Sequence, residues 1–284
     1  MAGSNGNGNG RSIGTGVTTG NGKPPMLLVH GFTGTPVMWD PLLPYLEPHH
    51  DVAAIALPGH FGGPAFTDPG ESIIETMLDA VELQMDELGW DKAHIVGNSL
   101  GGWISLLLAG RGRALSTVAI SPAGGWELGS SEVTRAVAIF KRQELSLKFF
   151  YPLAQELVKR PRGRVIALWD AVGYPERLPG HLASQWLEAS KGCSCRDLLI
   201  QFSGSVNAPD DLEIDGPVRI AWGTRDRILP YKRYAPRWKK ILPQAEWVSL
   251  DKLGHVPMSD APSLIAQTIL EVSTAAGAAA STKD

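Results

Sequence analysis

The stretch Gly97-Asn98-Ser99-Leu100-Gly101 decides the fold of this chain. It follows an apolar run at residues 93–96 and opens a second apolar segment at 100–109. This context predicts a strand that turns sharply into a helix, holding the serine in a strained conformation with its hydroxyl above the sheet edge. The start of the helix directs free N–H groups and a positive dipole end at the serine. We therefore predict Ser99 as a nucleophile and the Leu100 N–H as an oxyanion donor.

The pattern also allows two plainer interpretations. A Gly-rich strand-to-helix turn can also bind an anion or simply pack tightly. The same Gly-x-Ser-x-Gly pattern occurs at Gly10-Arg11-Ser12-Ile13-Gly14. This copy lies within a Gly- and Asn-rich segment that allows neither a strand before it nor a helix after it. We interpret that copy as a chance match, because the motif requires both elements.

Short apolar runs alternate with segments of helical periodicity along much of the chain. Such runs are typical of parallel strands covered by helices on both faces. The pattern predicts an α/β fold with a doubly wound, mostly parallel sheet. The six strand-like runs are residues 26–30, 52–57, 94–98, 117–121, 218–222 and 246–250.

The alternation breaks after Ser121 and resumes near Val218. Apolar residues in between recur at three- and four-residue spacing, which predicts a helical insertion at residues 126–205. We expect the core to comprise residues 26–125 and 206–274. The small, polar ends, residues 1–25 and 275–284, are predicted to be flexible tails.

Composition excludes several classes of function. The net charge is -3 with 19% charged residues, so electrostatics support no nucleic-acid partner. No apolar run reaches the roughly 20 residues that a membrane span requires. Cys193 and Cys195 have no further cysteine or nearby histidine pair in the sequence, and they predict neither a disulfide framework nor a zinc site. We expect reduced thiols and a cytoplasmic location.

A serine nucleophile requires a base within hydrogen-bond reach, and the base requires an orienting partner. Seven histidines compete for this role. His255 follows the last strand-like run and precedes the final helix, a position at the carboxyl edge of the sheet, where ligands bind in such folds. The other histidines lie in turns, in the loop at 58–63, at a strand or in the insertion. His255 is therefore the predicted base.

The acid is expected in a loop at the same edge. Asp226 follows the run at 218–222 and is preferred. Asp251 stands just past a strand end and could cap a turn instead, and Glu127 is a more distant rival.

The segment His30-Gly31-Phe32-Thr33-Gly34 directly follows the first strand-like run. Its glycines free the backbone to aim N–H groups into the cleft, so the Phe32 N–H is the second predicted oxyanion donor. His30 is expected mainly to bond loop backbone, with a place in the pocket as the lesser possibility.

Together these segments resemble the α/β-hydrolase superfamily over residues 26–272. The resemblance rests on the order Ser, Asp, His and on the segments HGFTG at 30–34, PGH at 58–60, GNSLGG at 97–102, GTRD at 223–226 and GHVP at 254–257. It is closer to lidded esterases, carbon–carbon bond hydrolases and lactone-type hydrolases than to haloalkane dehalogenases or epoxide hydrolases, which carry an aspartate where Ser99 stands. It also implies that residues 126–205 form a cap domain. Antiparallel first strands, usual in the family, are expected to be short or absent, because residues 14–25 show little apolar alternation.

We expect hydrolysis through an acyl-enzyme, with no metal or organic cofactor. The insertion is rich in aromatic residues and should roof a pocket for a small apolar ester-like substrate. The bond cleaved is expected to be a carboxylic ester, a thioester, a lactone or an activated carbon–carbon bond. Candidate pocket residues are His30, Trp126, Trp169, Trp186 and Val256. Two alternatives remain: a cofactor-free lyase or oxidase that uses His255 as base, and a non-catalytic receptor for a small molecule on the same fold.

Overall fold

The computed structural model describes residues 15–17, 22–66, 72–202 and 204–281. Its centre is a sheet of seven strands in the order β1-β3-β2-β4-β5-β6-β7. The pairs among β2 to β7 are parallel, and β1 joins β3 antiparallel. The predicted fold class is therefore confirmed. The strands are β1 Thr15–Val17, β2 Pro25–Val29, β3 Asp51–Ile55, β4 Ala93–Asn98, β5 Ala114–Ile120, β6 Val218–Gly223 and β7 Glu246–Leu250.

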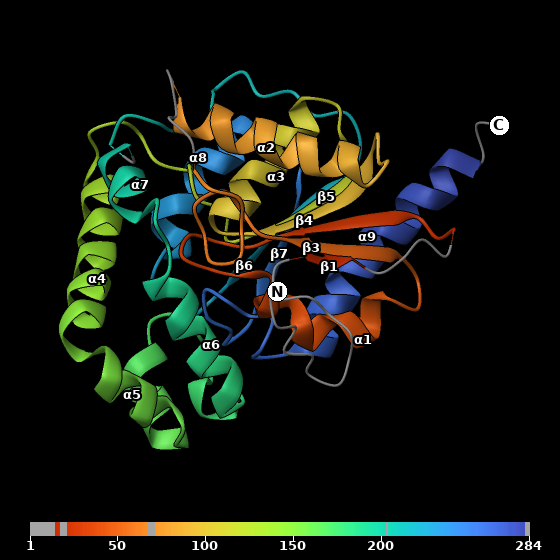
Figure 1. The fold of residues 1–284 in the computed structure, drawn as a ribbon. Helices are drawn as coiled ribbons and strands as arrows, with labels where there is room; N and C mark the ends of the chain where they lie inside the picture. Colours follow the sequence, from red (N-terminus) through yellow and green to blue (C-terminus); the bar gives the residue numbers. More distant parts are fainter. Residues whose placement is uncertain (1–14, 18–21, 67–71, 203, 282–284) are drawn as a thin grey trace.

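Alternate residues of the buried strands face two separate hydrophobic layers. Leu27 and Val29 of β2 belong to a layer with helices α2, α3 and α8, whereas Met26 and Leu28 belong to a layer with α1 and α9. Figure 1 shows these two groups of helices on opposite faces of the sheet. Their bounds are α1 Leu43–Leu46, which follows the 3-10 helix Pro36–Leu42, α2 Ile73–Glu87, α3 Leu100–Gly110, α8 Tyr231–Ile241 and α9 Pro262–Ser281.

The chain between β5 and β6 is helical, and here we call α4 to α7 the insertion helices. They gather at one side of the molecule, in green and teal in Figure 1. No described helix is long and apolar enough to cross a membrane. The bounds are α4 Ser131–Val158, α5 Pro161–Leu168, a short 3-10 turn at Pro175–Arg177, α6 Gly180–Lys191 and α7 Arg196–Phe202.

Both predicted tails need correction. Residues 15–17 form β1, which pairs with β3, and Pro25 already belongs to β2. A three-residue strand shows too little alternation to be recognised, but it covers the open edge of β3. At the other end, α9 continues through residues 275–281, because its alanines favour helix strongly. Residues 1–14, with the second serine motif, as well as 18–21 and 282–284, lie outside the described residues.

Candidate active site

Ser99 occupies the turn between β4 and α3, as the sequence predicts. Its backbone has φ 57° and ψ -117°, a left-handed conformation that costs energy for a residue with a side chain. The Ser99 N–H donates to the Ile120 carbonyl at 2.9 Å, which ties the turn to β5. The surrounding structure thus holds Ser99 in a strained conformation.

The two motif glycines are required by close backbone contacts. A Cβ atom at Gly97 would lie 2.1 Å from the Gly101 carbonyl oxygen. A Cβ at Gly101 would lie 2.1 Å from the carbonyl oxygen of Val29. Any side chain at either position would therefore push α3 away from the sheet.

His255 and Asp226 meet at the carboxyl edge of the sheet. Nδ1 of His255 lies 2.7 Å from Oδ2 of Asp226. The side chain of His255 is 5% exposed, and that of Asp226 is fully buried. The other carboxylate oxygen, Oδ1, accepts the N–H groups of Ile228 at 3.0 Å and Leu229 at 2.7 Å. Both oxygens of Asp226 are thus bonded, which fixes the imidazole with Nδ1 toward the acid.

Two polar residues that the sequence analysis missed hold the His255 loop. The Asn98 amide donates to the carbonyl oxygens of His255 at 2.9 Å and Ile120 at 3.1 Å. Asp260 accepts the Gly254 N–H at 2.9 Å and also the N–H of Gly173 at 2.8 Å, in the insertion. The place of Asn98 beside Ser99 was a usable signal, whereas nothing in the sequence distinguishes Asp260 from other loop acids.

The rival acids lie elsewhere. Asp251 has a side chain that is 76% exposed and lies near Thr224 and Lys252. Glu127 pairs with Arg237 at 3.1 Å. Of the three carboxylates considered, Asp226 is the one that the structure brings to His255.

Ser99 and His255 line a cavity of about 290 Å³ beneath the insertion helices. Phe32 lies in its wall from the core side, close to Ser99. Three predicted pocket residues, Trp169, Trp186 and Val256, also line it. Polar side chains are present too, namely Arg142 and Asp170, which pair at 2.8 Å, and Gln143, Ser146 and Ser190.

A second cavity of about 60 Å³ adjoins the first at Ser99. Phe32, Ser99 and Phe140 line both cavities, but His255 lines only the larger one. Leu100, Trp103 and Trp126 belong to the smaller cavity, which is almost wholly apolar. Trp126 thus lines this second cavity and not the larger one.

His30 does not line either cavity, which corrects its tentative place in the pocket. It is fully buried, with Nδ1 2.8 Å from the Gly31 carbonyl oxygen, while Nε2 accepts the Leu57 N–H at 3.1 Å. Burial, with a smaller contribution from His60, lowers the pKa of His30 from 6.5 to about 3. A neutral His30 therefore holds the Gly31-Phe32 backbone from behind.

That backbone lies directly against the serine turn. A Cβ atom at Gly31 would be 3.0 Å from the Cβ of Ser99 and 3.2 Å from the Asn98 carbonyl oxygen. Leu100 is the first residue of α3, so its N–H has no helical acceptor. The two N–H groups predicted as oxyanion donors thus belong to segments that flank Ser99.

Comparison with known proteins shows the family of this chain. Residues 24–262 match the alpha/beta hydrolase fold family. Epoxide hydrolase EphH of Mycobacterium tuberculosis is 33% identical over 195 residues, covering 68% of this chain and 91% of the relative. A pimeloyl-[acyl-carrier protein] methyl ester esterase of Neisseria meningitidis is 29% identical over 250 residues, covering 81% of this chain and 86% of the relative.

Solved structures show the same fold. The enol-lactonase from Burkholderia xenovorans LB400 superposes with a TM-score of 0.69 at 19% identity, covering 92% of this chain and 95% of the other. The 2-hydroxy-6-oxo-6-phenylhexa-2,4-dienoate hydrolase from Rhodococcus sp. strain RHA1 also gives 0.69, at 24% identity, covering 90% and 92%. The chain thus belongs to the alpha/beta hydrolase family and is an enzyme with hydrolytic activity.

Proposed function

We propose that this enzyme is a serine hydrolase that cleaves ester-type bonds through an acyl-enzyme. One observation carries the proposal: the strained Ser99 turn and the His255–Asp226 pair face one cavity. A lone anion-binding turn would not require a buried imidazole bonded to a buried carboxylate beside it.

In the proposed reaction, His255 takes the Ser99 proton as the serine oxygen attacks the substrate carbonyl. The N–H groups of Phe32 and Leu100 stabilise the oxyanion. His255 then protonates the leaving group, which departs and leaves an ester on Ser99. Water, activated by the same imidazole, releases the acid. Asp226 orients His255 and stabilises its charged form.

The two cavities suggest which part of the substrate lies where. Because His255 protonates the leaving group, that group has to lie in the larger cavity, which His255 lines. The acyl chain then enters the smaller cavity beside Leu100 and Trp126. Its volume of about 60 Å³ is less than half of the ~150 Å³ that takes a benzene molecule. We therefore propose a short apolar acyl group, on the order of two to four carbons.

The wider pocket gives the insertion its proposed role as a cap, residues 126–205, that selects the leaving group. Arg142, Asp170 and Gln143 offer hydrogen bonds there, whereas Trp169 and Trp186 offer apolar surface. An alcohol or thiol with both polar and apolar parts fits this lining. The two free thiols favour a cytoplasmic location, which belongs to this proposal as well.

Epoxide opening is a second candidate, because one relative is named an epoxide hydrolase. The chemistry at position 99 argues against it. A carboxylate that opens an epoxide forms an ester, which water can hydrolyse. A serine would form an ether, which an imidazole base and water do not cleave. Ser99 therefore favours acyl transfer.

A serine-directed fluorophosphonate tests the proposal directly. We expect peptide mass spectrometry to find the label on Ser99, and rapid mixing with p-nitrophenyl butyrate to show an acyl-enzyme burst. The Ser99→Ala variant should show neither, whereas a Ser105→Ala variant, altered in the same helix, should keep both. Full ester turnover in the Ser99→Ala variant would refute the covalent mechanism and favour His255 acting alone as a base.

A further inference from the structure

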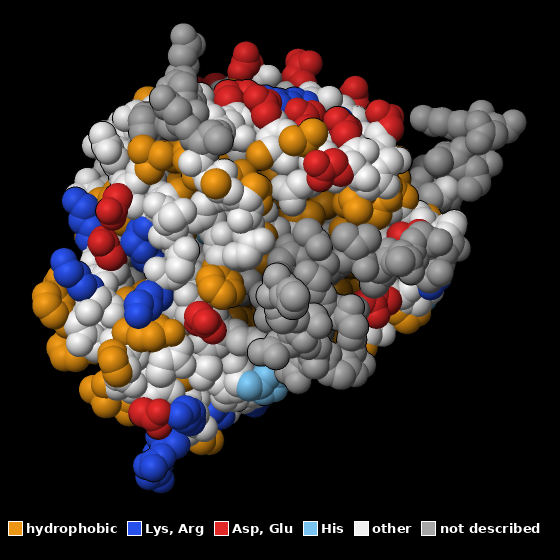
Figure 2. Space-filling model, in the orientation of Figure 1, with side chains coloured by type: hydrophobic (Ala, Val, Ile, Leu, Met, Phe, Trp, Pro, Cys, Tyr) orange, Lys and Arg blue, Asp and Glu red, His pale blue; other side chains and the backbone are white. Residues whose placement is uncertain are grey.

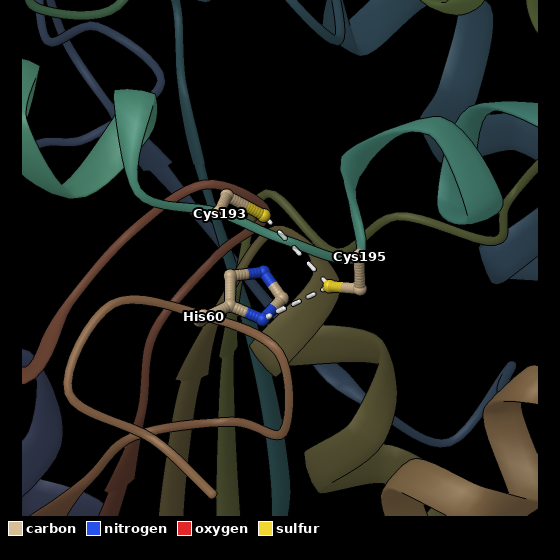
Figure 3. A group of neighbouring side chains, drawn as sticks. All are labelled: His60, Cys193 and Cys195. Carbon is tan, nitrogen blue, oxygen red and sulfur yellow. Dashed lines mark hydrogen bonds between the residues drawn. The ribbon is translucent and has the colours of Figure 1, made fainter. Parts of the chain in front are cut away.

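A buried cluster of His60, Cys193 and Cys195 lies outside the proposed reaction (Figure 3). His60 belongs to the loop after β3, and the cysteines lie between α6 and α7. The two sulfur atoms are 3.7 Å apart, and Sγ of Cys195 is 3.6 Å from Nδ1 of His60. Within the described part of the chain, this is the one group of three or more His, Cys, Asp or Glu side chains whose possible metal-ligand atoms all lie within 4.8 Å of one another.

The histidine in this cluster has an unused nitrogen. Nδ1 of His60 lies 3.1 Å from the Pro58 carbonyl oxygen, an acceptor, so Nδ1 carries the proton. The lone pair then resides on Nε2, which is buried and has no hydrogen-bond partner. His60 itself is 3% exposed. A histidine whose Nδ1–H donates to a backbone carbonyl while Nε2 is free has the arrangement typical of a metal ligand.

The spacing of the two sulfur atoms fits a small coordination sphere. With metal–sulfur bonds of about 2.3 Å and tetrahedral angles, two thiolates on one ion lie about 3.8 Å apart. The observed separation of the sulfur atoms is 3.7 Å. In Figure 3, Nε2 of His60 lies on the side of the ring toward Cys193, with Cys195 beside the same ring.

A metal ion binds cysteine as the thiolate, so a bound cation would supply the attraction needed to deprotonate the two thiols.

We propose that His60, Cys193 and Cys195 form a binding site for one thiophilic metal ion, Zn²⁺ or Cu⁺. Two thiolates and one imidazole are the soft ligand set that both ions prefer. Binding of Zn²⁺ or Cu⁺ releases the thiol protons and changes no oxidation state. The arrangement arises only in the folded chain, because 135 residues separate His60 from Cys195.

The position of the site links the insertion to the candidate oxyanion loop. The Ser194 N–H donates to the Gly59 carbonyl at 2.8 Å, so the insertion already contacts the loop after β3 that carries His60. The His60 ring stands 5.0 Å from the His30 ring and 6.1 Å from that of Phe32. A metal ion would therefore fasten the insertion to the core directly behind Phe32. This role does not depend on the identity of the ester substrate.

Metal analysis of the purified full chain tests the site. The protein is reduced with a phosphine, treated with chelator, and dialysed without oxygen against Zn²⁺ or Cu⁺ at graded free concentrations. We expect one ion per chain for at least one of the two metals. Cys193→Ser and Cys195→Ser should each weaken binding by more than about tenfold, and so should His60→Gln. His181→Gln, which alters an exposed histidine of the insertion, is the matched control and should bind like the native chain.

The outcomes separate cleanly. Retention of Zn²⁺ alone or of Cu⁺ alone supports the site and identifies its metal. Failure of the native chain to retain either ion overturns the proposal, as does binding that survives both cysteine substitutions unchanged. If His60→Gln does not fold, Cys193→Ser and Cys195→Ser still test the site. A rise in melting temperature on metal addition should occur in the native chain and be lost in those variants.

Discussion

The carboxyl edge of the sheet and the outer surface of the insertion are built in contrasting ways. At the edge, Asp226 is fully buried and both of its oxygens are bonded. Helix α4 of the insertion has 28 residues, of which only Val133, Ala136 and Val158 are buried. Large apolar side chains of α4 and α5 lie open to solvent, among them Phe149, which is 64% exposed. Figure 2 shows apolar side chains mixed with basic ones at the edge of the molecule where α4 and α5 lie.

This difference indicates a division of labour. Groups that transfer protons have to be held within a fraction of an ångström, which requires bonded, buried surroundings. A surface that admits substrate has to open, and elements with few buried contacts open at lower free energy. Changes at the sheet edge should therefore affect the rate of chemistry, whereas changes in the pocket walls should affect selection.

The largest expected effect is that of Ser99→Ala. Removing the nucleophile should lower kcat for a p-nitrophenyl ester by about 10⁶-fold, with the remaining rate due to binding and the oxyanion donors. The melting temperature should change little, since the side chain accepts no hydrogen bond at the start of α3. Steady-state kinetics and a thermal scan measure both. If the variant retained a tenth of native turnover, Ser99 would not be the nucleophile.

Asp226→Asn should have the next largest effect. The amide would bond the imidazole less favourably and could not stabilise its charged form, so kcat should fall by about 10⁴-fold with KM nearly unchanged. Asp251→Asn is the matched control, because it makes the same substitution on the exposed side of a nearby loop. We expect its kcat to stay within about twofold of the native value. The reverse pattern in the two variants would make Asp251 the orienting acid.

The sequence was most informative where backbone geometry restricts residue type. A Cβ atom at Gly97 or Gly101 would lie 2.1 Å from a backbone carbonyl oxygen, and such a constraint is visible in the residue types of the motif. The order of strands and helices was equally readable, because both faces of the sheet are buried. The short β1 and the alanine-rich end of α9 were missed, since neither carries an apolar pattern.

Side-chain placement in the insertion was less predictable. Trp169 and Trp186 reach the cavity, but Trp126 lines the smaller space and Phe149 faces solvent. Helical periodicity identifies an apolar stripe without saying which surface covers it. The contact of His60 with Cys195 joins segments 135 residues apart, so no local pattern could have indicated it.

The comparison of the two cavities predicts an acyl-length optimum set by the smaller cavity, beside Ser99 and Leu100. For p-nitrophenyl esters, kcat/KM should rise about fourfold per CH₂, which corresponds to 0.8 kcal/mol, and fall once the small cavity is full. Trp126→Phe enlarges that cavity and should move the optimum to a longer chain. Trp169→Ala, in the larger cavity, should leave the optimum in place and raise KM for bulky leaving groups. If Trp169→Ala moves the optimum instead, the acyl chain lies in the larger cavity and the leaving group in the smaller one.

The core and the insertion also differ in their histidines, since two histidines of the core are buried close together. His50 and His94 stand with ring centroids 5.2 Å apart, and Nδ1 of His94 is 2.8 Å from Oγ of Ser116. Burial lowers the pKa of both from 6.5 to about 4, with repulsion from His94 adding to the effect at His50. His181 of the insertion, by contrast, is exposed.

Mild acid should therefore weaken the core through these histidines. Between pH 6.5 and 4 the unfolded chain binds protons that the folded chain excludes, so stability is full above 6.5 and is lost as pH falls. Each such histidine adds a slope of up to about 1.4 kcal/mol per pH unit. Urea unfolding across this range should show a shallower dependence for His94→Gln and an unchanged one for His181→Gln. Equal slopes in all three proteins would mean that His94 is protonated in the folded core.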